Sequence, residues 1–119
     1  MAKRFTDEEL KETLDEYLSC LEKKIQIDKA LLFGSYAKGC ANSWSDIDLL
    51  IISKALPETS PKGANGFYLD KLVGLEKIPP ELEVIGVHPS KLLNPSTQYF
   101  YDEILRTARE FNLKTKDFD

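Results

Sequence analysis

The sequence predicts a single α/β domain in which helices flank a small mixed β-sheet. Three apolar segments, at 30–33, 49–52 and 82–87, have the length and composition of buried strands. Segments with a helical repeat of apolar residues precede, separate and follow them. Because 119 residues is the usual length of one domain, residues 1–119 are assigned to one domain.

The first helix is expected within residues 5–25. Thr6 is a candidate N-cap, and Glu9 three residues later completes a capping box. The apolar residues of this segment recur at a 3.6-residue period and define one inward face: Leu10, Leu14, Tyr17, Leu18, Leu21 and Ile25.

Three strands are expected at Ile27–Phe33, Asp46–Ser53 and Leu82–Val87. The second strand is apolar over four consecutive residues, which indicates that helices cover it on both faces. A short helical turn is expected directly after the first strand, from Ser35.

The remaining elements are predicted from proline, glycine and apolar spacing. Two prolines and two glycines in Pro57–Gly66 predict a loop. Phe67–Lys77 predicts a short helix whose inward residues are Tyr68, Leu72 and Leu75. After Pro95 and Ser96 a last helix is predicted, with Phe100, Ile104, Ala108 and Phe111 on its inward face. The polar tail at 112–119 is expected to fray.

Composition argues against several classes of protein. No apolar run approaches the ~20 residues of a membrane span, and the first residues lack the apolar region of a signal peptide, so a cytoplasmic protein is expected. The net charge of −4 argues against strong nucleic-acid binding. Cys20 and Cys40 have no zinc-site spacing and are expected to be free thiols.

Two carboxylates mark the start of the second strand. Asp46 and Asp48 are two positions apart, so in a strand they point to the same face, with Ile47 turned to the other. Paired oxygen ligands are what Mg²⁺ prefers, and two ions ~4 Å apart can assist phosphoryl transfer. Taken alone, the two aspartates also fit a solvated strand entrance without a metal.

Gly34 and Ser35 follow the first strand. A glycine lets backbone N–H groups approach a phosphate closely, and the free amides of a short helical turn at Ser35 favour an anion. If the first two strands pair antiparallel, this turn faces the two aspartates. The pattern Gly-Ser-x10-Asp-x-Asp should arise by chance in such a chain with a probability on the order of one in a thousand.

The segment FGSYAKGCANSWSDIDLLI resembles the signature of the nucleotidyltransferase superfamily that includes DNA polymerase beta and kanamycin nucleotidyltransferase. In size the chain is similar to the minimal nucleotidyltransferases (MNT type), which are often paired with a helical HEPN protein. The resemblance implies the polymerase beta-like fold. It also implies that Gly34 and Ser35 bind the triphosphate and that Asp46 and Asp48 hold two Mg²⁺ ions.

The resemblance further implies a third carboxylate on a later strand, which acts as a catalytic residue and metal ligand. The corresponding stretch is PPELEVIGVHP, and Glu83 is the candidate because it shares a strand face with Ile85 and Val87. Glu81 has the same parity and remains the second candidate.

Three other side chains near the motif have alternative interpretations. Lys38 stands where the family often has an arginine, and it is a candidate nucleotide contact because a lysine can meet a phosphate as a point charge. Trp44 either stacks on a base or covers the edge of the core. His88, the only histidine, is expected to be a loop residue without a catalytic role.

The resemblance implies a magnesium-dependent enzyme that transfers a nucleoside monophosphate from an NTP, with ATP expected, to a hydroxyl and releases pyrophosphate. It suggests a tyrosine of a HEPN toxin as the acceptor, with this chain as the antitoxin of a toxin–antitoxin system. A small-molecule acceptor such as an aminoglycoside is an alternative, although those relatives carry a further helical domain. The other alternative is a catalytically silent module that binds a nucleotide or a partner. The acceptor, the base preference and the oligomeric state are left open.

Overall fold

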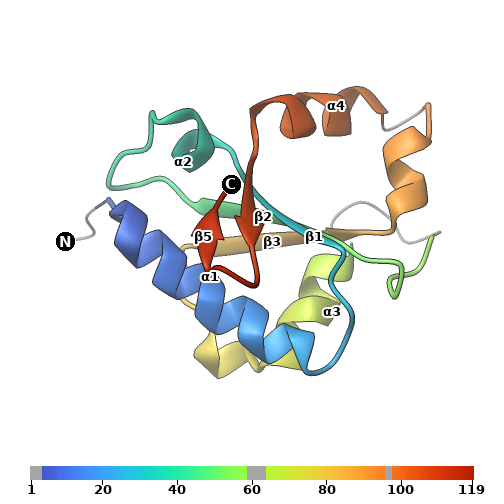
Figure 1. Ribbon diagram of the computed structural model, residues 1–119, viewed down its shortest axis with the longest axis horizontal. Helices are drawn as coiled ribbons and strands as arrows, with labels where there is room; N and C mark the ends of the chain where they lie inside the picture. Colours follow the sequence, from blue (N-terminus) through green and yellow to red (C-terminus); the bar gives the residue numbers. More distant parts are fainter. Residues whose placement is uncertain (1–3, 59–63, 96–97) are drawn as a thin grey trace.

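A computed structural model describes residues 4–58, 64–95 and 98–119 (Figure 1). The helices are α1 (Asp7–Glu22), α2 (Ser35–Lys38), α3 (Ala64–Val73) and α4 (Gln98–Thr107), with 3-10 turns η1 (Leu75–Lys77) and η2 (Pro89–Leu93). The strands are β1 (Lys29–Phe33), β2 (Ile47–Ile52), β3 (Leu82–Val87), β4 (Arg109–Asn112) and β5 (Asp117–Phe118). Within these ranges no helix is long and apolar enough to cross a membrane.

The first helix begins as the sequence predicts. The Thr6 hydroxyl accepts a hydrogen bond from the Glu9 N–H (3.1 Å), and the Glu9 carboxylate accepts one from the Thr6 N–H (2.9 Å). This capping box satisfies two backbone donors that the first helical turn leaves without intrahelical partners. The inward face of α1 is buried as expected at Leu10, Leu14, Tyr17, Leu18 and Leu21.

The strands form a mixed sheet in the order β3-β2-β1-β4-β5. β1 pairs antiparallel with both β2 and β4, whereas β2 pairs parallel with β3. Figure 1 shows α1 and α3 on one side of this sheet and α4 on the other. Leu49–Ile52 of β2 are buried because the sheet is covered on both faces. The α/β fold and the mixed sheet are therefore confirmed.

The last predicted helix is too long by one turn. α4 ends at Thr107, and Arg109–Asn112 form β4, whose Leu31–Glu110 and Leu32–Arg109 pairs extend the sheet beyond β1. Phe111 is buried as predicted, but it enters the core from a strand, on the side of the sheet that α1 covers. The open edge of β1 offers backbone hydrogen bonds that local helix periodicity does not reveal.

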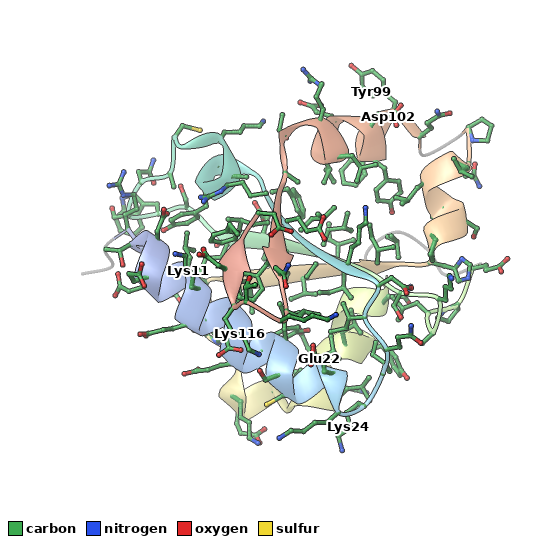
Figure 2. The ribbon with its side chains drawn as sticks, viewed as in Figure 1. Lys11, Glu22, Lys24, Tyr99, Asp102 and Lys116 are labelled. Carbon is green, nitrogen blue, oxygen red and sulfur yellow. The ribbon has the colours of Figure 1, made fainter. Side chains whose placement is uncertain are left out.

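The expectation of a frayed tail is also wrong. Phe118 in β5 pairs with Phe111, and the two rings meet edge to face with centroids 5.5 Å apart. Lys116 donates to Ser19 and lies 2.8 Å from an Asp15 carboxylate oxygen, so the turn before β5 is tied to α1 (Figure 2). The polar tail thus carries one aromatic anchor, Phe118, and one cationic partner for α1, Lys116.

The third helix begins earlier than predicted and is rotated relative to the expected face. α3 starts at Ala64, and the predicted loop at Pro57–Gly66 lies partly outside the described residues. The Asn65 side chain donates to the Gly86 carbonyl of β3, and a Cβ at Gly66 would overlap the Val84 carbonyl. This close approach turns Leu69 and Val73 inward and leaves Tyr68 and Leu75 exposed.

We expect Phe111→Ala to lower the free energy of unfolding by about 3–5 kcal/mol, because a buried ring is lost and a cavity remains. Chemical denaturation monitored by circular dichroism measures this change. Lys114→Ala, in the exposed turn between β4 and β5, is the control and should cost less than about 0.5 kcal/mol. Equal effects of the two substitutions would show that the C-terminal hairpin contributes nothing to the core.

Candidate active site

Strand register brings one residue from each of three strands into a row. Phe33 at the end of β1 pairs with Asp48 of β2, and Asp48 pairs with Glu83 of β3. Directly paired residues point to the same face of a sheet. The Asp48 and Glu83 side chains therefore lie side by side, while the role of Glu83 as the third carboxylate stays a prediction.

These carboxylates occupy the face of the sheet that α4 partly covers. The alternate β2 residues Ile47, Leu49 and Ile51 belong to the core beneath α1 and α3. Leu50 and Ile52, which share the parity of Asp48, pack instead with α4 residues Tyr101 and Ile104. This face of the sheet is therefore apolar and closed beneath α4, and at its other end it carries the half-buried Asp48 and the exposed Glu83.

The Asp48 carboxyl has a strongly perturbed environment. Its pKa is raised from 3.8 to about 6, first by burial, then by the neighbouring charge of Glu83 and the charge of Asp46. A hydrogen bond with the Glu83 side chain raises the same pKa further. Asp46, directly before β2, and Glu83 are both exposed. The site therefore concentrates negative charge at the edge of the core and favours a cation or a proton there.

The turn after β1 adjoins this row. Gly34 is the N-cap of α2 with a φ of 75°, and Ser35 is the first residue of that helix. The Gly34 carbonyl accepts from the Lys38 N–H at 3.1 Å, and the Ser35 carbonyl accepts from the Cys40 N–H at 3.0 Å. β1 and β2 pair antiparallel, which was the condition for this turn to face the aspartates, so the Gly34–Ser35 turn lies at the Asp48 end of the sheet.

The donor set fits a divalent cation in its chemistry. Carboxylate oxygens are preferred Mg²⁺ ligands, and a bound cation would stabilise the ionised Asp48 carboxylate against the burial and the neighbouring charges that raise its pKa. Among the described residues, however, no three His, Cys, Asp or Glu side chains are grouped closely enough to hold one ion. A magnesium centre made by Asp46, Asp48 and Glu83 therefore stays a prediction.

The two candidates for the third carboxylate have different positions. Glu83 lies within β3, directly opposite Asp48. Glu81 precedes the strand, and its backbone carbonyl accepts from the Ile47 N–H at 2.7 Å. Lys38, the candidate nucleotide contact, is exposed in the last turn of α2.

Trp44 does not cover the edge of the core, because its side chain is 82% exposed. The turn that carries it is held by hydrogen bonds from the Asn42 N–H to Ser45 Oγ and from the Trp44 N–H to Asn42 Oδ1, both 2.9 Å. Stacking of Trp44 on a base stays a prediction.

His88 has a local structural contact, in agreement with its expected loop role. Its Nδ1 accepts from the Ser90 N–H and so caps η2. His88 follows the opposite end of β3 from Glu83, which separates it from Asp48 and Glu83, and its Nε2 lies 3.5 Å from the Glu58 carboxylate. Cys20 and Cys40 are both free, as predicted.

One contact in the site was missed by the sequence interpretation. A Cβ atom built on Gly34 would overlap Oδ2 of Asp48 and lie 3.2 Å from its Cγ. The spacing of Gly34 and Asp48 gave no signal for this contact, because it depends on the register of β1 against β2.

The fold, the Gly-Ser turn and the paired carboxylates define a class of protein. A model of the family described as "Nucleotidyltransferase domain" matches residues 14–118, so this chain belongs to that family. A solved structure from Sulfolobus solfataricus, titled a "putative nucleotidyltransferase", aligns over 92% of this chain and 85% of its own length. Its TM-score is 0.63 at 18% sequence identity, which establishes the shared fold.

Two curated relatives come from Methanocaldococcus jannaschii. "Putative protein adenylyltransferase MJ1305" is 47% identical over 51 residues, which is 41% of this chain and 35% of the relative. "Putative protein adenylyltransferase MJ0141" is 44% identical over 39 residues, which is 33% of this chain and 39% of the relative. The matched segments therefore span well under half of each relative.

We expect Asp48→Asn to raise the melting temperature by a few degrees at about pH 8, where the half-buried carboxylate is ionised at a cost from burial and from the charges of its neighbours. A raised native pKa means that folded Asp48 holds its proton more tightly than the unfolded chain does. The difference in melting temperature between Asp48→Asn and the wild type should therefore shrink as the pH falls from about 6 toward 3.8. Differential scanning fluorimetry across this range measures it.

Asp102→Asn, on the exposed side of α4, is the matched control for Asp48→Asn (Figure 2). It should leave the melting temperature nearly unchanged over the same range. A pH-independent effect of Asp48→Asn would contradict a protonation equilibrium at that carboxyl.

Proposed function

We propose that this chain is a magnesium-dependent nucleotidyltransferase that moves a nucleoside monophosphate from an NTP, with ATP the expected donor, to a hydroxyl group. The observation that carries the proposal is the pairing of Asp48 with Glu83, next to the Gly34 turn, in a chain of the nucleotidyltransferase family. Asp46, two positions before Asp48, adds a further carboxylate.

The residues of the site have separable roles in this proposal. The N–H groups at the start of α2, at Ser35, bind the triphosphate, and Lys38 adds a positive charge. Asp46, Asp48 and Glu83 would hold two Mg²⁺ ions, which supply positive charge for the triphosphate and for the departing pyrophosphate. Glu83 receives the proton of the attacking hydroxyl, which is adjacent to the α-phosphorus.

The proposed acceptor is a hydroxyl of a protein. The names of the two curated relatives, both called "putative protein adenylyltransferase", support a protein acceptor and ATP as donor. The resemblance to minimal nucleotidyltransferases favours a tyrosine of a helical HEPN toxin, with this chain as the antitoxin. The test is to incubate the chain with labelled ATP, Mg²⁺ and the product of the neighbouring gene, and to locate the label by mass spectrometry.

We expect Glu83→Gln to lower the transfer rate by about 10²–10⁴-fold while nucleotide binding is retained, because the group that accepts the proton is lost. The rate is measured with labelled ATP and binding is measured by calorimetry. Glu81→Gln is the control, since Glu81 precedes β3, and it should change the rate little. The reverse result would assign the role to Glu81, and a wild-type chain that binds ATP but transfers nothing would favour the silent module.

We expect ATP with Mg²⁺ to raise the melting temperature, and ATP with a chelator to raise it much less, because ligand binding to the native state stabilises it. Asp46→Asn should remove most of this metal-dependent shift while the fold is kept, since one negative ligand is lost without a change of volume. A shift of equal size with and without Mg²⁺ would contradict the metal site.

A further inference from the structure

The backbone of Gly34 lies directly against the Asp48 carboxylate. An L-side chain at position 34 would overlap Asp48 Oδ2 and approach Cγ to 3.2 Å and Cβ to 3.4 Å. The first contact is impossible and the second is tighter than most Cβ contacts, whereas the third is ordinary van der Waals distance. The space where a Cβ would stand is therefore occupied by the end of the Asp48 side chain.

The obstacle is a rotatable carboxylate, and the backbone of the neighbouring strand does not obstruct this space. A Cβ at position 34 could therefore be accommodated if Asp48 rotated away from β1. Such a rotation would leave the backbone pairing of Phe33 with Asp48 in place. It would move the carboxylate away from its present position beside Glu83, the residue with which Asp48 is paired across β2 and β3.

We propose that Gly34 is a positioning residue. Because it has no side chain, it leaves room beside the turn for the Asp48 carboxylate, and this room sets where that carboxylate lies. This inference rests on the proposed function, because it concerns the geometry of that site. It adds to the expectation that Gly34 lets a phosphate approach the backbone closely. The φ of 75° is a second requirement for glycine, and it is independent of the contact with Asp48.

The effect of the contact with Asp48 and the effect of the backbone strain at positive φ can be separated by two variants, Gly34→Ala with L-alanine and Gly34→Ala with D-alanine. L-Alanine at position 34 introduces both the strain of positive φ and the overlap with Asp48. D-Alanine adopts positive φ readily, and its methyl group projects from the other side of Cα. Because Cys40 follows Gly39, both variants can be made by joining a synthetic 1–39 thioester to an expressed 40–119 segment through the native cysteine.

We expect the L-alanine variant to fold, with a lower melting temperature, and to bind Mn²⁺ about 10–100-fold more weakly than wild type, as is typical when a metal ligand loses its support. Its crystal structure should show the Asp48 carboxylate rotated away from Glu83. The D-alanine variant should keep both the wild-type carboxylate position and the Mn²⁺ affinity. Electron paramagnetic resonance with Mn²⁺ alone measures the affinity without a need for an acceptor or for turnover.

Two results would overturn the positioning role. One is an L-alanine variant whose Asp48 carboxylate and Mn²⁺ affinity are unchanged. The other is a folded D-alanine variant that loses Mn²⁺ as completely as the L-alanine variant. A wild-type chain that binds no Mn²⁺ would count against the proposed metal-dependent function, while the Asp48 position in the two crystal structures would still decide whether Gly34 orients that carboxylate.

Discussion

The antiparallel pairing of β1 with β2 sets the positions of the central strands, of the turn at Gly34 and of the Asp48 carboxylate. It runs from Lys29–Ile52 to Phe33–Asp48, with buried leucine, isoleucine and alanine side chains along most of its length. Burying each large aliphatic side chain stabilises the fold by roughly 1.5–3 kcal/mol, so a slip of register would be costly. Because the register is held by the core, the turn at Gly34 and the carboxylate of Asp48 are held next to each other by the pairing of their strands.

The sheet uses its two faces differently. Beneath α1 and α3, the core extends along the whole of β2 and includes Phe111 from the C-terminal hairpin. On the other face, α4 closes over Leu50 and Ile52, and the sheet then continues into Asp48 and Glu83. A rigid apolar layer therefore supports a half-open polar edge. The burial and charge repulsion that raise the Asp48 pKa are tolerated because the core on the opposite face supplies the stability.

The sequence allowed most of the fold and the site residues to be predicted where the signal was local. The capping box of Thr6 and Glu9, the inward face of α1 and the third strand are all present. The Gly-Ser turn and the two aspartates were found because strand parity and motif spacing are properties of neighbouring residues. The errors fell at Tyr68 and Leu75, which were expected to point inward, at Phe111, which is buried from a strand and not from a helix, and at the tail, which forms β5. Helix periodicity did not reveal the element or the rotation that the whole structure imposes.

By itself, the sequence determined the family, the order of the main elements and the carboxylates available for chemistry, because these depend on residue type and short-range spacing. Only the tertiary structure decided that β4 and β5 extend the sheet, that Glu83 stands opposite Asp48, and that Gly34 makes room for that carboxylate. Each of these relations joins residues far apart in the chain. They are fixed by backbone hydrogen bonding at strand edges and by side-chain volume, and neither leaves a local pattern to read.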